Sequence, residues 1–179
     1  MPPRHPRLWL MTDERMGDGL WRALERLPRG AGVVFRHYGL PTVDRRHLFA
    51  EVRAVARRRR LVLLLGGTPR EAIGWRADGS HGRSRHRWSA RPLLRSAPCH
   101  GRRALIAARR DGVALRFVSP LHATRSHPGA LPLGRVRTGL AIIGERRGLI
   151  ALGGMTARRF AAARELGFQG WAAIDAWSA

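Results

Sequence analysis

Residues 149–156 read Leu149-Ile150-Ala151-Leu152-Gly153-Gly154-Met155-Thr156, and this stretch decides the class of fold. Four apolar residues in a row are typical of a strand buried on both faces, and the two glycines make a tight turn after it. Thr156 is a good N-cap for a helix over 157–166, which Gly167 ends before a second apolar strand starts at Gly170. A strand, a helix and another strand in this order predict a parallel βαβ unit with a right-handed crossover.

The same alternation extends back through the chain. Strands are expected at 8–12, 31–37, 61–65, 77–79, 93–98, 114–118, 149–152 and 170–174. Helices are expected at 19–27, 43–59, 70–75, 102–110, 135–143 and 157–166. Eight strands predict an α/β fold, namely a shortened TIM (β/α)8 barrel in which loops replace some helices and no helix follows strand eight. A flavodoxin-like sheet of fewer strands is the alternative, because it suits a short chain better.

Length and composition narrow the class of protein. The chain has 179 residues, of which 44% are hydrophobic, and this predicts a single domain over residues 1–179 with a substantial core. One cysteine, Cys99, excludes an internal disulfide and a zinc site built from cysteines. The apolar runs are too short for a membrane span, and the basic N-terminus lacks the apolar stretch of a secretory signal. We therefore expect a cytoplasmic protein with no membrane partner.

Charge is the unusual property of the sequence. All 34 cationic residues are arginine, against 12 acidic residues, which gives a formal net charge of +22. Without lysine, Schiff-base chemistry and a P-loop lysine are excluded. The charge and the run Arg57–Arg60 would suit a basic nucleic-acid-binding protein, and nonspecific polyanion binding is expected in any case. However, the arginines are spread over every segment, and no RNA-binding signature is found.

Two segments offer anion-binding groups at the carboxyl ends of strands, where active groups of parallel barrels lie. Gly153 and Gly154 let the backbone approach a phosphate, and the next helix begins with free N–H groups. A tight turn without a ligand would read the same way. The loop after the sixth strand adds hydroxyl, arginine and histidine donors, namely Thr124, Arg125, Ser126 and His127. An ordinary solvated loop is the alternative reading of this second segment.

Short motifs in chain order resemble the thiamine-phosphate synthase/TenI family. Residues Leu10-Met11-Thr12-Asp13 resemble its first strand, Val34-Phe35-Arg36 its second, and Ala77-Asp78-Gly79-Ser80-His81 its fourth. Residues 120–129 and 151–155 resemble the sixth- and seventh-strand motifs. The resemblance implies a barrel that acts on or binds thiazole phosphate in thiamine biosynthesis. Synthases of this family are transferases that join it to a pyrimidine pyrophosphate with magnesium, whereas TenI-type members are isomerases that tautomerise a thiazole precursor.

The resemblance also implies roles for single residues. The thiazole phosphate would be held by Thr124, Ser126, Gly153 and Gly154, with Arg125 and His127 as further anion contacts. Arg36 would face pyrophosphate in a synthase. His100 resembles the acid–base histidine of the tautomerases, a role that suits the imidazole ring. The alternative for His100 is an ordinary residue at the start of a helix.

The chain departs from the family pattern where synthases bind magnesium. Gly66-Gly67 stand in place of an Asn-Asp pair after the third strand, and Gly82-Arg83-Ser84-Arg85 carry no carboxylate after the fourth. Magnesium prefers carboxylate ligands, so we assign no metal ligand and no firm cofactor. Arg83, Arg85 and Arg125 form a hypothetical replacement that neutralises pyrophosphate without metal. Synthase, tautomerase and a catalytically degenerate barrel that only binds a phosphate ligand all stay open.

Other family positions differ as well. Tyr38 and His127 stand where the family has lysines, and Asp175 stands where it presents a serine to phosphate. A carboxylate at that place would oppose an anion unless it turns away or is paired. Without an eighth helix the last strand would leave an apolar flank, which predicts a homodimer or a distorted barrel wall. Trp171 and Trp177 are the expected dimer contacts.

Overall fold

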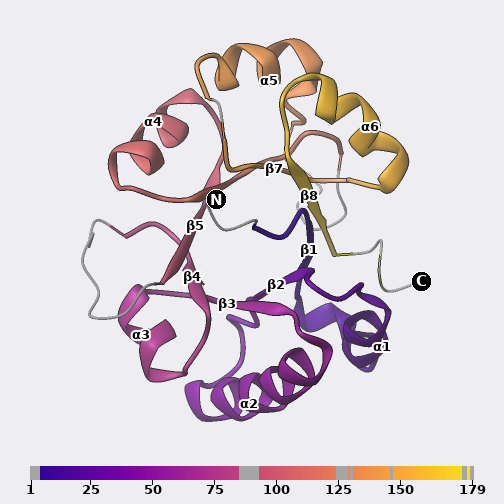
Figure 1. Cartoon of the computed structure of the whole chain (residues 1–179), viewed down its shortest axis with the longest axis vertical. Helices are drawn as coiled ribbons and strands as arrows, with labels where there is room; N and C mark the ends of the chain where they lie inside the picture. Colours follow the sequence, from indigo (N-terminus) through magenta and orange to yellow (C-terminus); the bar gives the residue numbers. More distant parts are fainter. Residues whose placement is uncertain are drawn as a thin grey trace.

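Eight parallel strands close into a barrel in chain order, with β8 paired to β1 (Figure 1). The computed structural model describes residues 5–84, 93–123, 129, 131–145, 147–174 and 177. The strands are β1 (Leu8–Met11), β2 (Gly32–Phe35), β3 (Val62–Gly66), β4 (Gly79–His81), β5 (Leu94–Cys99), β6 (Leu115–Val118), β7 (Leu149–Leu152) and β8 (Gly170–Ala173). The closed barrel confirms the predicted fold class and excludes an open flavodoxin-like sheet.

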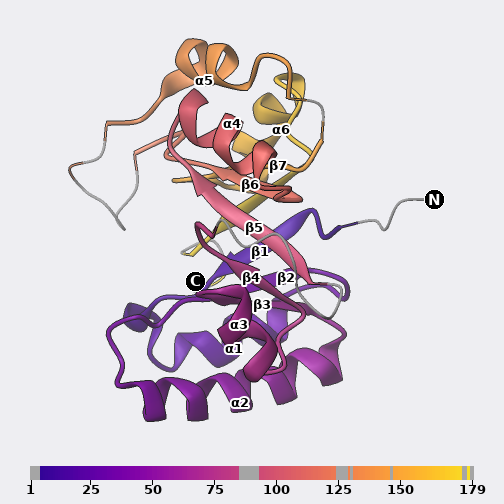
Figure 2. The same ribbon diagram turned by 90° about the vertical axis from the view of Figure 1, so that its left-hand side faces the viewer.

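Six α-helices surround the barrel in two groups of three, as Figures 1 and 2 show. They are α1 (Gly19–Arg26), α2 (Thr42–Arg59), α3 (Pro69–Gly74), α4 (Arg102–Arg110), α5 (Gly134–Ile142) and α6 (Ala157–Glu165). In the described part of the chain, no helix lies between β4 and β5 and none follows β8. None of the described helices is long and apolar enough to cross a bilayer.

Most boundaries lie within two residues of those expected, and two differences have a clear cause. A 3-10 helix η1 (Glu14–Met16) follows β1 because Asp13 caps it through the backbone N–H of Arg15. The fourth strand begins at Gly79 and not at Ala77, because the Asp78 carboxylate accepts a hydrogen bond from the N–H of Leu63 at 2.8 Å. Asp78 therefore anchors the turn that precedes the strand.

Aromatic side chains fill the interior of the barrel. The register of β1 and β2 sets Trp9 opposite Gly32, and a Cβ atom on that glycine would collide with the indole ring. Trp9 meets Phe117 of β6 edge-on, with ring centroids 5.4 Å apart, and Phe117 meets His81 of β4 at 5.0 Å. Because β1, β4 and β6 are not neighbours, these contacts cross the barrel and make its centre a packed core.

The helices pack on the outer face through a second set of aromatic contacts. Phe35 of β2 lies edge-on to Phe49 of α2, and Phe49 lies edge-on to Trp75. Two strands away from β2, Trp171 of β8 is buried and stacks on Trp177, with ring centroids 5.4 Å apart. Trp177 thus covers the flank of β8 within its own chain. The homodimer that these two tryptophans suggest stays a prediction.

Candidate functional site

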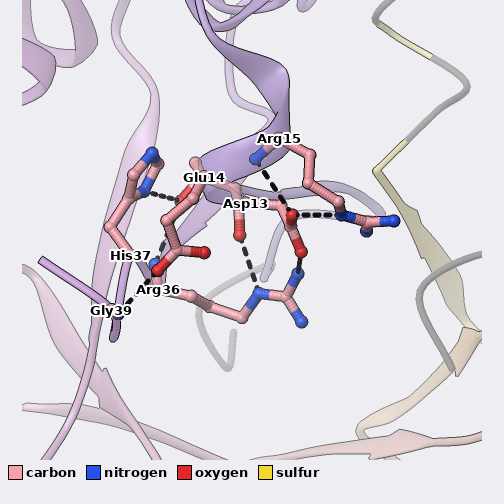
Figure 3. Close-up of polar contacts among 7 residues, drawn as sticks. Asp13, Glu14, Arg15, Arg36, His37 and Gly39 are labelled. Atoms are coloured by element: carbon pink, nitrogen blue, oxygen red, sulfur yellow. Dashed lines mark hydrogen bonds and ion pairs between the residues drawn. The ribbon is translucent and has the colours of Figure 1, made fainter.

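Arg36 lies at the carboxyl end of β2, and its side chain is hydrogen-bonded to residues at the end of β1 (Figure 3). Its Nε donates to the carbonyl of Thr12 at 2.7 Å and its Nη2 donates to Asp13 Oδ2 at 2.8 Å. The Arg36 and Asp13 side chains are 18% and 15% exposed. Among the described residues, no partner is found for the other terminal nitrogen of Arg36. The guanidinium is therefore fixed in position while one of its ends stays available.

Asp13, at the carboxyl end of β1, is the counter-ion of both Arg36 and Arg15. It also accepts a hydrogen bond from Arg15 Nε at 2.6 Å (Figure 3). Burial alone would raise the pKa of Asp13, but the hydrogen bonds from Arg15 and the charge of Arg36 outweigh it and lower that pKa below its ordinary value. Asp13 is thus ionised near neutral pH and holds both arginines.

Thr12 connects this ion pair to His37. Its hydroxyl accepts the backbone N–H of Arg36 at 3.0 Å and lies 2.9 Å from Nδ1 of His37. His37 adopts a φ of +41° and stacks on Phe35 with ring centroids 4.8 Å apart. Burial lowers the pKa of His37, although Glu14 and Asp13 act in the opposite direction. A neutral His37 accepts the Thr12 hydroxyl proton in a hydrogen bond, which makes the turn after β2 rigid.

Arg45 reaches from the first turn of α2 over the ends of β2 and β3. Its Nε donates to the carbonyl of Arg36 at 2.8 Å and its Nη2 to the carbonyl of Gly66 at 2.6 Å. The guanidinium carbon lies 5.1–5.7 Å from the ring centres of Phe35, Tyr38 and Trp75. The helical periodicity predicts that the arginines of this helix point outward, and Arg45 does not, because its long side chain folds back onto the strands.

The two glycines at the end of β3, which stand in place of an Asn-Asp pair, have close neighbours where a side chain would begin. A Cβ atom on Gly66 would lie 2.5 Å from the Tyr38 hydroxyl and 2.9 Å from the carbonyl oxygen of Phe35. A Cβ atom on Gly67 would lie 2.9 Å from Glu71 Oε2, and Glu71 already accepts the N–H of Thr68 at 2.7 Å. Across the described residues, no three His, Cys, Asp or Glu side chains converge as metal ligands. These residues do not fit the magnesium site that the synthase resemblance implies.

His81 of β4 is a site residue to which the sequence motif assigns no role. Its Nδ1 lies 2.9 Å from Ser96 Oγ, and that hydroxyl donates to the carbonyl of Ser80 at 3.1 Å. Nδ1 therefore carries the proton, and Nε2 is the acceptor. Burial, together with the charge of Arg36, lowers the pKa of His81 to about 3, so the ring is neutral.

His100 follows β5 and is exposed at the same end of the barrel. Its Nδ1–H donates to the carbonyl of Ser119 at 3.0 Å, and the Ser119 hydroxyl lies 3.3 Å from the same nitrogen. This hydrogen bond fixes the ring and leaves Nε2 with a free lone pair. Such an arrangement can accept and return a proton.

Gly153 and Gly154 follow β7 and lie against the segment after β6. Their φ angles are +95° and +59°, which are unfavourable for other residues. A Cβ atom on Gly153 would lie 2.7 Å from Pro120 Cα, and one on Gly154 would collide with the carbonyl oxygen of Ala123. The helix α6 begins three residues later, capped by Thr156, which accepts the N–H of Arg159 at 3.2 Å. The turn therefore offers backbone groups at a helix N-terminus, and the Arg159 side chain lies against it and donates to the carbonyl of Gly154.

The structure tests the predicted site only in part. Arg36, His100, Gly153 and Gly154 all lie at the carboxyl ends of the strands, as predicted. Four predicted contacts, Thr124, Arg125, Ser126 and His127, lie outside the described residues, as do Arg85 and Asp175. Arg83 lines a cavity of about 430 Å³ beside α4, which Arg103 and Asp111 also line. Thr12, His37, Arg45 and His81 are additional residues whose places in the site are shown only by their tertiary contacts.

The chain is similar in sequence and in structure to known proteins. The chain matches the sequence profile of the family described as thiamine monophosphate synthase over residues 8–177. No curated protein matches it in sequence. A thiamine phosphate pyrophosphorylase from Pyrococcus furiosus is similar in structure, with a TM-score of 0.77, 17% identity, and coverage of 96% of this chain and 87% of that one. The enzyme of that name from Bacteroides thetaiotaomicron has a TM-score of 0.61, 16% identity, and coverage of 96% and 83%. The YdjI aldolase from Escherichia coli has a TM-score of 0.62, 10% identity, and coverage of 96% and 76%.

Proposed function

We propose, from the premise that this chain belongs to the thiamine monophosphate synthase family, that it binds thiazole phosphate and acts in thiamine biosynthesis. The observation that carries the proposal is the turn of Gly153 and Gly154, where positive φ angles and close neighbours leave no room for side chains. Backbone N–H groups at the start of α6 would bind the phosphate there. Thr124 and Ser126 would add hydroxyl donors, and Arg125 and His127 would add charge.

Coupling to a pyrimidine pyrophosphate is the first reaction that we propose for this site. The new bond to thiazole phosphate forms as the bond to diphosphate breaks, so negative charge develops on the leaving group. Arg36, fixed by Thr12 and Asp13, would stabilise that charge because its guanidinium is already in place before the reaction. Its role in this reaction is that of a catalytic residue touching the leaving diphosphate.

Tautomerisation of a single thiazole ligand is the second candidate, and His100 favours it. The hydrogen bond to Ser119 leaves Nε2 of His100 free at the rim, where it could take a proton from one ligand atom and return it to another. This reaction needs no second substrate and no metal ion. A barrel that binds the phosphate ligand without catalysis is the remaining alternative.

Ligand binding tests the proposal with a matched pair of variants. Gly154→Asp places a carboxylate in the turn, and Gly167→Asp makes the same change beyond the other end of α6, also at a positive φ but with nothing within 4 Å of the new Cβ. We expect thiamine phosphate and thiazole phosphate to bind the unaltered protein in isothermal titration. Gly154→Asp should weaken binding by about tenfold or more, and Gly167→Asp by less than about twofold.

Two outcomes contradict the proposal: no binding of either ligand, or equal binding by the two variants. Assays of coupling and of tautomerisation then separate the reactions. His100→Asn should abolish tautomerisation while binding is kept, because the amide cannot carry a proton between ligand atoms.

A further inference from the structure

The carboxylates near the ends of β1, β2 and β3 are already engaged within the protein. Asp13 is bound by Arg15 and Arg36, and Glu14 Oε1 accepts the N–H of Gly39 at 2.8 Å (Figure 3). Glu71 accepts both the N–H and the hydroxyl of Thr68 at 2.7 Å. Each of these three carboxylates is therefore already hydrogen-bonded within the protein, and among the described residues no three possible ligands converge on a cation site.

Arg45 brings positive charge to the ends of β2 and β3 without a direct carboxylate contact among the described residues, although Glu71 and Glu14 lie near enough to act on its pKa. Its side chain is half-buried, and within the described residues it forms no ion pair. Its recorded hydrogen bonds go to two backbone carbonyls, and three aromatic rings surround it. A half-buried guanidinium without a carboxylate partner is uncommon, because burial penalises an uncompensated charge.

The contacts of Arg45 fix its orientation but do not use all of its donors. A guanidinium has five N–H donors, and the two carbonyls occupy one on Nε and one on Nη2. Arg36, whose carbonyl accepts from Arg45, likewise keeps a terminal nitrogen for which no partner is found among the described residues. Planar, fixed guanidinium groups of this kind recognise phosphate oxygens well.

We infer that Arg45 and Arg36 together bind the diphosphate group of the second substrate, without a divalent metal ion. This inference rests on the proposed function, and it assigns to Arg45 the neutralising role that a metal would otherwise have. The Tyr38 hydroxyl fills the space beside Gly66, which explains why this edge carries glycine.

Binding of inorganic pyrophosphate tests the inference directly. Isothermal titration of the unaltered protein is done in EDTA and again in magnesium, at the same ionic strength. The Kd should change by less than about twofold between the two conditions, since no metal takes part. Arg45→Gln should raise the Kd by about tenfold, the loss expected for a hydrogen bond to a charged group.

Arg46→Gln is the matched control, because Arg46 is the next residue of α2 and is exposed. It removes the same charge from the same helix and should raise the Kd by less than about twofold. Arg45→Lys keeps the charge but loses the planar fork, and its Kd should lie between those of Arg45→Gln and the unaltered protein. Circular dichroism of each variant shows whether it is folded.

Three results would overturn the inference. The first is pyrophosphate binding that appears only with magnesium, which needs no variant and therefore stands even if Arg45→Gln does not fold. The second is an equal Kd for Arg45→Gln and Arg46→Gln. Arg45 would then have only a structural role, which is to hold α2 against the ends of β2 and β3. The third is a Kd for Arg45→Lys equal to that of the unaltered protein. If thiamine phosphate binding still depends on Gly154 in any of these cases, the proposed function survives and only this inference fails.

Discussion

The two halves of the barrel rim present different chemical groups: charged side chains in one half and backbone groups in the other. At the ends of β1, β2 and β3, charged side chains are interlocked, and Arg36 and Arg45 are held by carbonyls and by Asp13. At the end of β7, the rim is formed by the backbone of Gly153 and Gly154, which touches the segment after β6. One half offers fixed positive charge, and the other offers backbone N–H groups in a tightly packed turn. The first should therefore be sensitive to loss of charge and the second to added volume.

The largest effect should come from added volume at Gly153. In Gly153→Ala the new methyl group would lie 2.7 Å from Pro120 Cα at a φ of +95°, so backbone must move. We expect the free energy of unfolding to fall by about 2–4 kcal/mol in urea titrations. Gly112→Ala is the control, because its φ is +68° with nothing within 4 Å, and it should lose only about 1 kcal/mol. Equal losses would show that the rim at Gly153 is not tightly packed.

A smaller effect should separate the two glycines at the end of β3. Gly66→Ala meets the carbonyl oxygen of Phe35 at 2.9 Å and the Tyr38 hydroxyl at 2.5 Å, whereas Gly67→Ala meets only the flexible end of Glu71. Unfolding in urea should show a loss of about 1–3 kcal/mol for Gly66→Ala and less than about 1 kcal/mol for Gly67→Ala. The opposite order would mean that Tyr38 does not occupy this edge.

Acid should weaken the charged half through Asp13. Its pKa is lower in the folded protein than its ordinary value of 3.8, so its stabilising effect is complete above that value. The effect is lost as the pH falls below 3.8 through the folded pKa. Asp13→Asn should remove this part of the acid dependence, at a cost near neutral pH of about 1 kcal/mol. Urea titrations of both proteins at several acidic pH values measure it, and identical pH profiles would contradict the ion pair.

The smallest effect should come from an ion pair away from the rim. Arg135 on α5 lies 2.9 Å from Glu165 on α6, and both side chains are more than 60% exposed. Glu165→Gln should change the free energy of unfolding by less than about 0.5 kcal/mol. A loss as large as that of Asp13→Asn would remove the distinction between the rim pair and surface pairs.

Most of the fold follows from local patterns. The apolar run at 149–152, the turn at Gly153 and the cap at Thr156 predict β7 and α6 to within one residue. The start of β4 does not follow from them, because it depends on the Asp78 carboxylate meeting Leu63, fifteen residues earlier. The packing of Trp177 on β8 could not be predicted either, because its stacking on Trp171 forms only once the barrel is closed.

The positions of the candidate site residues could be predicted where short motifs carry them, but not where contacts between distant parts of the chain do. Gly153, Gly154, Arg36 and His100 follow from motifs at strand ends. Arg45 does not, because helical periodicity describes where a Cβ atom points and not where a long guanidinium side chain reaches. His81 stands within a motif, but its fixed tautomer requires Ser96 and Ser80 from the neighbouring strand and its own.

A crystal structure with thiamine phosphate and pyrophosphate, grown in the presence of magnesium, tests the central claim most directly. The account predicts the ester phosphate at the turn of Gly153 and Gly154, and the diphosphate within hydrogen-bond distance of Arg36 and Arg45 with no metal between them. A phosphate bound in the cavity beside α4, or a magnesium ion joining the diphosphate to carboxylates, would contradict it.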